Sequence, residues 1–182
     1  MNVLQRMISI LDPINEYLGR AIATLALVLA AIVFAIVALR YGFHTSNQWL
    51  SESMIYAHGM LFMLGMGYTL RHDGHVRVDV LSRHFSPRGA AWRELFGTIF
   101  LLFPVSLFLL IMSINYVAAS WSIHEGSMEP GGIPYLYLLK TLLIIMPILL
   151  MIQGLTEALR AIEILRQHHP DLPDHPDTRE GV

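Results

Sequence analysis

The chain contains no cysteine, and few of its residues are charged. Of its 182 residues, 14% are Asp, Glu, Lys or Arg, and the formal net charge is −2. Without cysteine, the chain has no disulfide, no thiolate metal ligand and no thiol nucleophile. The charges are scattered rather than gathered on a basic face, so the chain lacks the positively charged surface with which proteins bind nucleic acids. These absences exclude thiol-dependent and nucleic-acid-binding proteins.

Apolar residues dominate the composition instead. They make up 54% of the chain, and the mean hydropathy is +0.52. A water-soluble globular protein of this length carries more charge and fewer apolar residues. The composition therefore predicts an integral membrane protein.

Four apolar segments are long enough to cross a bilayer. At about 1.5 Å per helical residue, a segment of roughly 20 residues spans a hydrocarbon core of about 30 Å. We expect an all-α membrane protein with four transmembrane helices, at about residues 18–41, 49–70, 92–118 and 134–157. These helices and the segments between them form a membrane domain of residues 1–167.

The two ends of the chain differ from these segments. Residues 2–18 have apolar side chains at steps of three and four, which predicts a short N-terminal interfacial helix. Asp12 followed by Pro13 breaks this pattern and predicts the cap and first turn of the next helix. A frayed terminus is the alternative. Residues 168–182 contain three prolines and little to bury, which predicts a disordered tail.

Arginines set the expected orientation. Of the twelve Lys and Arg residues, five fall between Arg71 and Arg93, and basic loops favour the cytoplasmic face. Segment 120–133 contains Glu125 and Glu129 but no Lys or Arg, which fits the outer face. We therefore expect both termini and the tail in the cytoplasm.

Only three ionisable side chains fall clearly inside the apolar segments, and these are Glu52, His58 and Lys140. A charge in hydrocarbon is costly unless it pairs or reaches the headgroups. Glu52 and Lys140 lie at similar depth near the outer ends of their segments, so we predict an ion pair between them. The alternative is that each reaches the outer headgroups separately.

His58 lies deeper, where a histidine serves as a proton carrier, a haem ligand or a hydrogen-bonded packing residue. Packing is the favoured role, because a haem-binding bundle needs histidines in pairs and the other histidines fall in loops or at interfaces. In the loop after the second segment, the histidines and aspartates at positions 72, 73, 75 and 79 have the composition of a metal site. A solvated polar turn is the favoured interpretation.

No complete solute or ion site can be assembled from these residues. The first and third segments have no ionisable residue at their centres, and the sequence has no phosphate-binding loop and no nucleophile with a base. The sequence therefore indicates a non-catalytic membrane scaffold that assists another protein. Two alternatives stay open: a membrane anchor subunit of a redox enzyme, and a small self-associating exporter.

Four features, taken in order, give the chain a family resemblance. They are Glu52 shortly after a tryptophan, the run Gly74-His75-Val76-Arg77-Val78-Asp79-Val80, the triplet Glu125-Gly126-Ser127, and Pro134 followed by Lys140. In this order and spacing, across about residues 10–165, the chain resembles the small membrane subunit (DctQ-like) of the tripartite ATP-independent periplasmic (TRAP) transporters.

This resemblance implies a role in secondary transport. The subunit would be a fixed scaffold in the bacterial inner membrane, bound to a large multi-span permease subunit, while a periplasmic solute-binding protein delivers an organic acid, typically a carboxylate. The sodium gradient would drive uptake, and this chain would bind no cofactor and no metal. For Arg77 and Asp79, a solvated turn and a contact with the partner or with anionic headgroups both stay open. The candidate structural or partner-interface residues are Glu52, Lys140, His75, Arg77, Asp79 and Glu125.

Overall fold

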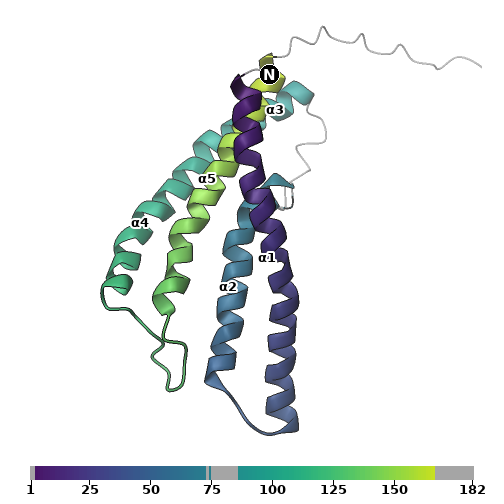
Figure 1. The fold of residues 1–182 in the computed structure, drawn as a ribbon. Helices are drawn as coiled ribbons and strands as arrows, with labels where there is room; N and C mark the ends of the chain where they lie inside the picture. The colour runs from purple at the N-terminus through teal and green to yellow at the C-terminus, as the bar shows by residue number, and fades with distance from the viewer. Residues whose placement is uncertain (1–2, 73, 75–85, 167–182) are drawn as a thin grey trace, which may run out of the picture.

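The computed structural model describes residues 3–72, 74 and 86–166. Within these residues the chain is helical and has no strand (Figure 1). The predicted disordered tail and the loop residues His75, Arg77 and Asp79 lie outside the described residues. The elements are α1 (Val3–Gly42), α2 (Gln48–Arg71), α3 (Pro87–Gly97), the π-helical segment η1 (Thr98–Leu102), α4 (Phe103–Ser122) and α5 (Leu136–Arg166).

The long helices α1, α2 and α5 all contact one another, and α4, among the described long helices, packs against α5 only. Their order is α4, α5, α2, α1, and α3 packs against α5 at one end (Figure 1). Within the described residues, α4 makes no contact with α1 or α2. Because α5 has neighbours on both sides, it contributes much of the buried surface, including Leu142, Leu149, Leu150, Ala158 and Ala161.

The first helix is continuous through Pro13, so the predicted break at Asp12 and Pro13 is wrong. α1 runs for 40 residues with Pro13 inside it, and residues 3–18 form its first turns rather than a separate short helix. Proline has no N–H to donate to the carbonyl of Ser9, which removes one helical hydrogen bond. Asp12 does not serve as an N-cap, because its side chain pairs instead with arginines of α2 and α5.

The third predicted segment contains an irregular turn where it meets α5. Before Pro104, the chain forms η1, in which the N–H of Phe103 donates to the carbonyl of Thr98, five residues earlier. Such π-turns replace the regular bonding pattern next to a proline. Here the turn brings Leu102 so close to Gly154 of α5 that a side chain at position 154 would overlap it.

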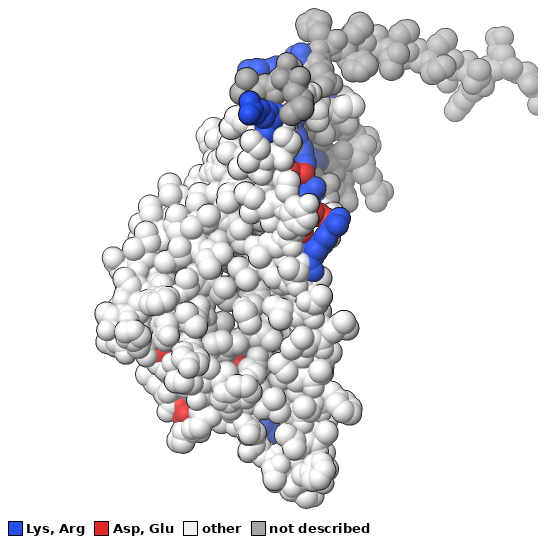
Figure 2. Space-filling model, viewed as in Figure 1, with Lys and Arg blue, Asp and Glu red and all other residues white. Residues whose placement is uncertain are grey.

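Three helical stretches are long and apolar enough to cross a membrane, namely Leu4–Gly42, Pro87–Ser122 and Leu136–Arg166. They contain three of the four predicted segments. α2 is not among them, because polar residues such as Glu52 and His58 interrupt its apolar sequence. On the face shown in Figure 2, the charged side chains lie toward the two ends and the middle of the surface is uncharged. This distribution is that of a membrane protein.

Candidate functional site

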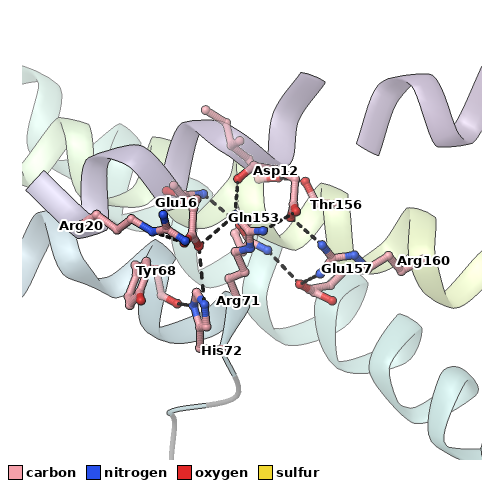
Figure 3. A network of polar contacts seen from close by, with 12 residues as sticks. Asp12, Glu16, Arg20, Tyr68, Arg71, His72, Gln153, Thr156, Glu157 and Arg160 are labelled. Atoms are coloured by element: carbon pink, nitrogen blue, oxygen red, sulfur yellow. Dashed lines mark hydrogen bonds and ion pairs between the residues drawn. The ribbon is translucent and has the colours of Figure 1, made fainter. Parts of the chain in front are cut away.

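Three helices are joined by a cluster of charged side chains that we call the inner cluster: Asp12 and Glu16 of α1, Arg71 of α2 and Arg160 of α5 (Figure 3). The two carboxylate oxygens of Asp12 lie 2.7 Å from Nη2 of Arg71 and 2.6 Å from Nη2 of Arg160. Nη1 of Arg71 lies 3.1 Å from Oε2 of Glu16. Partly buried, charge-assisted contacts of this kind are stronger than neutral hydrogen bonds. Asp12 thereby links α1 to two other helices.

Further polar side chains extend the inner cluster at its edges. Glu16 also pairs with Arg20 and lies 3.5 Å from Nε2 of His72. On α5, Glu157 accepts hydrogen bonds from Arg160 and from Gln153, each at 2.8 Å. Figure 3 shows these residues gathered where α1, α2 and α5 meet.

Below the charges, a buried amide pair continues the junction between α1 and α5. Asn15 is 1% exposed and Gln153 is fully buried. Nδ2 of Asn15 donates to the carbonyl of Leu149 at 3.2 Å and to Oε1 of Gln153 at 3.1 Å. On its other side Asn15 packs on Gly67 of α2, where a side chain would overlap its amide group. Gly67 is therefore needed for the close approach of α2 to α1.

At the opposite end, Glu52 of α2 holds the loop between α4 and α5. Its Oε2 accepts a 2.6 Å hydrogen bond from the backbone N–H of Ile133, and its Oε1 accepts from the hydroxyl of Ser127 and from Nε2 of Gln48. The loop approaches so closely that a side chain at Gly132 would overlap both Ser127 and Glu52. Glu52 thus fastens residues 127–133 to the end of α2.

Lys140 belongs to the same end but has a different partner from the predicted one. Its Nζ lies 2.5 Å from Oε2 of Glu125 and 4.2 Å from the ring centroid of Tyr116. The predicted ion pair between Glu52 and Lys140 is therefore wrong. The physical reason is that the loop folds over the helix ends, where it supplies donors to Glu52 and a carboxylate to Lys140.

The hydrogen bond from Lys140 holds the pKa of Glu125 below its usual range. The backbone of Glu125 also takes part, since its carbonyl accepts from the N–H of Tyr137 at 3.2 Å. One turn further along α5, the indole N–H of Trp121 donates to Thr141 at 2.9 Å. We call Glu52, Glu125, Ser127 and Lys140 the outer cluster.

The structure thus unites three of the predicted site residues, Glu52, Glu125 and Lys140, in one cluster. His75, Arg77 and Asp79 lie outside the described residues. Sequence reasoning missed the inner cluster, although Asp12 and Glu16 carry a signal, because residues four apart share one helix face. Within the described residues, no group of three or more His, Asp or Glu side chains could hold a metal ion.

His58 lies on neither cluster but on a groove between α1 and α2. The groove has a volume of about 490 Å³, and Ile22 of α1 and Leu61 and Gly65 of α2 contribute to its lining. His58 is exposed there, and its ring stacks on Phe62 with 6.3 Å between centroids. No hydrogen bond joins it to another described residue, so the predicted role as a hydrogen-bonded packing residue is wrong within this chain.

The comparison with protein families found one match. The family model "DctQ: Tripartite ATP-independent periplasmic transporters, DctQ component" matches residues 29–164. This range contains the whole outer cluster, together with Arg71 and Arg160 of the inner cluster, whereas Asp12 and Glu16 precede it. Neither the search of curated proteins nor the search of solved structures found a match to the chain.

Proposed function

The chain belongs to the DctQ component family of the tripartite ATP-independent periplasmic transporters, and from this premise we propose that it is the small, non-catalytic scaffold subunit of such a transporter. The complex takes up an organic acid, typically a carboxylate, and sodium ions moving down their gradient drive the uptake. The solute and sodium sites belong to a large multi-span permease subunit, and a periplasmic binding protein delivers the solute. The family match gives no support to a redox-enzyme anchor.

The observation that carries the scaffold role is the way the long helices pack. A solute pathway needs walls on more than one side, and transporter sites lie between packed repeats near the bilayer midplane. In this chain α1, α2 and α5 pack directly on one another, and α4, among the described long helices, contacts only α5. The charged side chains gather in the inner and outer clusters, toward the two ends of these helices. Such an arrangement suits a stationary support for a larger partner.

The spacing of the clusters supports four membrane-crossing helices, with α2 as the fourth. Glu52 and Arg71 are separated by about 19 residues of α2, or roughly 28 Å. Lys140 and Glu157 mark a similar length of α5, roughly 26 Å. Both lengths are close to the hydrocarbon thickness of about 30 Å, so the two clusters fit the two borders of one bilayer.

Charge supports an inner-membrane protein with both termini in the cytoplasm. The arginines at and after the end of α2 favour the cytoplasmic face, and the inner cluster lies at that end. The outer loop contains Glu125 and Glu129 without Lys or Arg between residues 120 and 133. The N-terminus of α1 and the C-terminus of α5 are at the same end as the inner cluster (Figure 1).

Reconstitution tests the proposal. The purified chain, a large permease subunit of such a transporter and the matching binding protein are placed in liposomes, and uptake of labelled carboxylates is measured with and without an inward sodium gradient. We expect sodium-dependent uptake from the complete set and none from the chain alone. Solute flux through the purified chain alone, or a haem absorbance that disappears in His58→Ala, would contradict the scaffold role.

A further inference from the structure

We propose that the groove between α1 and α2 is the surface on which a transmembrane helix of the large permease subunit packs, and that His58 forms a hydrogen bond with a polar group of that helix. This inference rests on the proposed function and deepens it. It assigns the contact with the partner to one face of one helix pair, and it gives His58 a role.

The depth of the groove is the first argument. It extends along α2 from His58 to Thr69, between the levels of the outer and inner clusters. His58 is about 9 Å along the helix from Glu52 and roughly 20 Å from Arg71. If the clusters mark the borders of the bilayer, this imidazole lies in the hydrocarbon region. A polar side chain there faces protein or water rather than lipid tails, because tails offer no hydrogen-bond partner.

The unsatisfied polarity of His58 is the second argument. Its side chain is exposed, its one ring contact is with Phe62, and no described residue hydrogen-bonds to it. An occupant of the groove must therefore bring a donor or acceptor at this depth. A helix of another membrane subunit can supply one, and an acyl chain cannot.

The shape of the groove is the third argument. Gly65 has open space where a side chain would begin, and Ala23 of α1 adds little bulk. Small residues of this kind let two helix backbones approach closely. The larger side chains of Leu61, Phe62 and Met66 complete the lining, and the surface inside is mostly apolar. The groove therefore fits the side chains of a facing helix.

The surface of α4 has a different character. α4 exposes large apolar side chains, among them Leu107, Phe108, Ile111 and Met112. The helix has no acidic, basic or histidine residue from Phe103 to Ser122. Lipid tails satisfy these apolar side chains, although α4 also exposes the amide of Asn115 further along. We therefore assign the part of α4 around Phe108 to the lipid and the groove to the partner.

Photo-crosslinking tests this assignment in the assembled complex. Benzoylphenylalanine replaces Phe62 in the groove or Phe108 on α4, a matched pair because these side chains are 59% and 60% exposed. Each variant is co-expressed with the large subunit and irradiated in membranes. We expect the large subunit to crosslink at position 62 and not at position 108. Crosslinking at position 108 alone would overturn the assignment.

Co-purification gives a second, independent measurement. Gly65→Trp fills the groove without overlapping the chain's own atoms at the site of attachment, and Ile111→Trp adds the same side chain to α4. We expect Gly65→Trp to retain about tenfold less large subunit than wild type, and Ile111→Trp to retain a wild-type amount. His58→Phe keeps a ring beside Phe62 but cannot hydrogen-bond, so it should also lose partner, and His58→Gln should restore part of it.

The remaining outcomes separate the two levels of the proposal. A Gly65→Trp variant that keeps the wild-type melting temperature and its full share of large subunit would overturn the inference. Loss of a co-purified phospholipid from that variant, with the subunit retained, would assign the groove to a lipid instead. If wild-type chain captures no large subunit at all, the proposed function itself fails.

Discussion

Arg71 contacts Asp12 twice, once at the carboxylate and once at the backbone carbonyl. Nη2 of Arg71 lies 2.7 Å from Oδ2 of Asp12, and Nη1 donates to the carbonyl oxygen of the same residue at 2.8 Å. The guanidinium group of Arg71 thus contacts a helical turn in which Pro13 has already removed one backbone hydrogen bond. The contact lies at the position where α1 continues through a sequence that normally starts a helix.

Removing the carboxylate of Asp12 should weaken the junction of α1, α2 and α5. In Asp12→Ala, Arg71 and Arg160 each lose a charged acceptor, so the free energy of unfolding should fall by about 2 kcal/mol. Denaturant titration in detergent micelles, followed by circular dichroism, measures the loss. Asp12→Asn keeps an acceptor and should lose less. Equal losses of stability in Asp12→Ala and Asp12→Asn would contradict this, because they would mean that the negative charge of Asp12, and not its acceptor oxygen, accounts for the whole effect.

The contact between Gly67 and Asn15 should appear as an energetic coupling. Gly67→Ala places a methyl group against the buried amide of Asn15 and should cost about 1–3 kcal/mol of stability. In the double variant with Asn15→Ala the overlap disappears, so the total loss should be smaller than the sum of the two single losses. Thermal unfolding of the four proteins measures the coupling. Strictly additive losses would contradict the overlap.

Glu52 should control the order of the outer loop without affecting the helices. Glu52→Gln leaves a poorer acceptor for the N–H of Ile133, so residues 125–133 should exchange amide hydrogens faster, by about tenfold. Hydrogen exchange with mass spectrometry resolves this loop from α4 and α5. Glu129→Gln is the matched control, because Glu129 lies in the same loop with an exposed side chain. Faster exchange in the control would argue against a specific role of Glu52.

The Glu125 and Lys140 pair predicts a pH dependence. The hydrogen bond from Lys140 lowers the pKa of Glu125 below 4.5 in the folded protein. A lowered pKa means that the pair stabilises the loop above about pH 4.5 and that this contribution is lost as the pH falls through the folded pKa. In Lys140→Met the pKa of Glu125 should rise. Titration of the carbon-13-labelled carboxyl group by NMR reads it directly, and an unchanged pKa would contradict the pairing.

The proposed orientation can be tested with single thiols, because the native chain has no cysteine. Met128→Cys lies in the outer loop, where Met128 is 93% exposed. Arg88→Cys lies near the start of α3 at the proposed cytoplasmic end. An impermeant maleimide should label position 128 in intact cells, and position 88 only after the inner membrane is opened. The reverse pattern would invert the topology.

The sequence was sufficient for the helical class and for the family, but three local predictions, two of them concerning charged residues, were wrong for physical reasons. The Asp12-Pro13 pair has the chemistry of a helix start, yet it lies inside α1, where Asp12 pairs with arginines of distant helices. Residue counting gave Glu52 and Lys140 a similar distance from the start of their segments, and the predicted pair depended on that. The actual partner depends on how each helix is shifted and rotated and on how the loop between α4 and α5 folds.

His58 and Gln153 illustrate a further limit. Both are polar residues in apolar helices, yet Gln153 is fully buried in a hydrogen-bonded junction and His58 is exposed on a groove. Their sequence surroundings do not distinguish them, because burial depends on which neighbouring helix covers that face. The signal that was available for the inner cluster was the spacing of Asp12 and Glu16, which places two carboxylates on one side of α1.

The way α4 is attached determines how force passes through the protein. Because α4 touches neither α1 nor α2 in the described chain, strain that a moving neighbour imposes on α1 reaches α4 through α5 or through the loop that Glu52 holds. α5 therefore connects α4 to the other helices, and the close contact between Leu102 and Gly154 is one place where it does so. Substitutions that weaken the packing of α5 should therefore separate α4 from α1 and α2, whereas substitutions in α4 should loosen α4 alone.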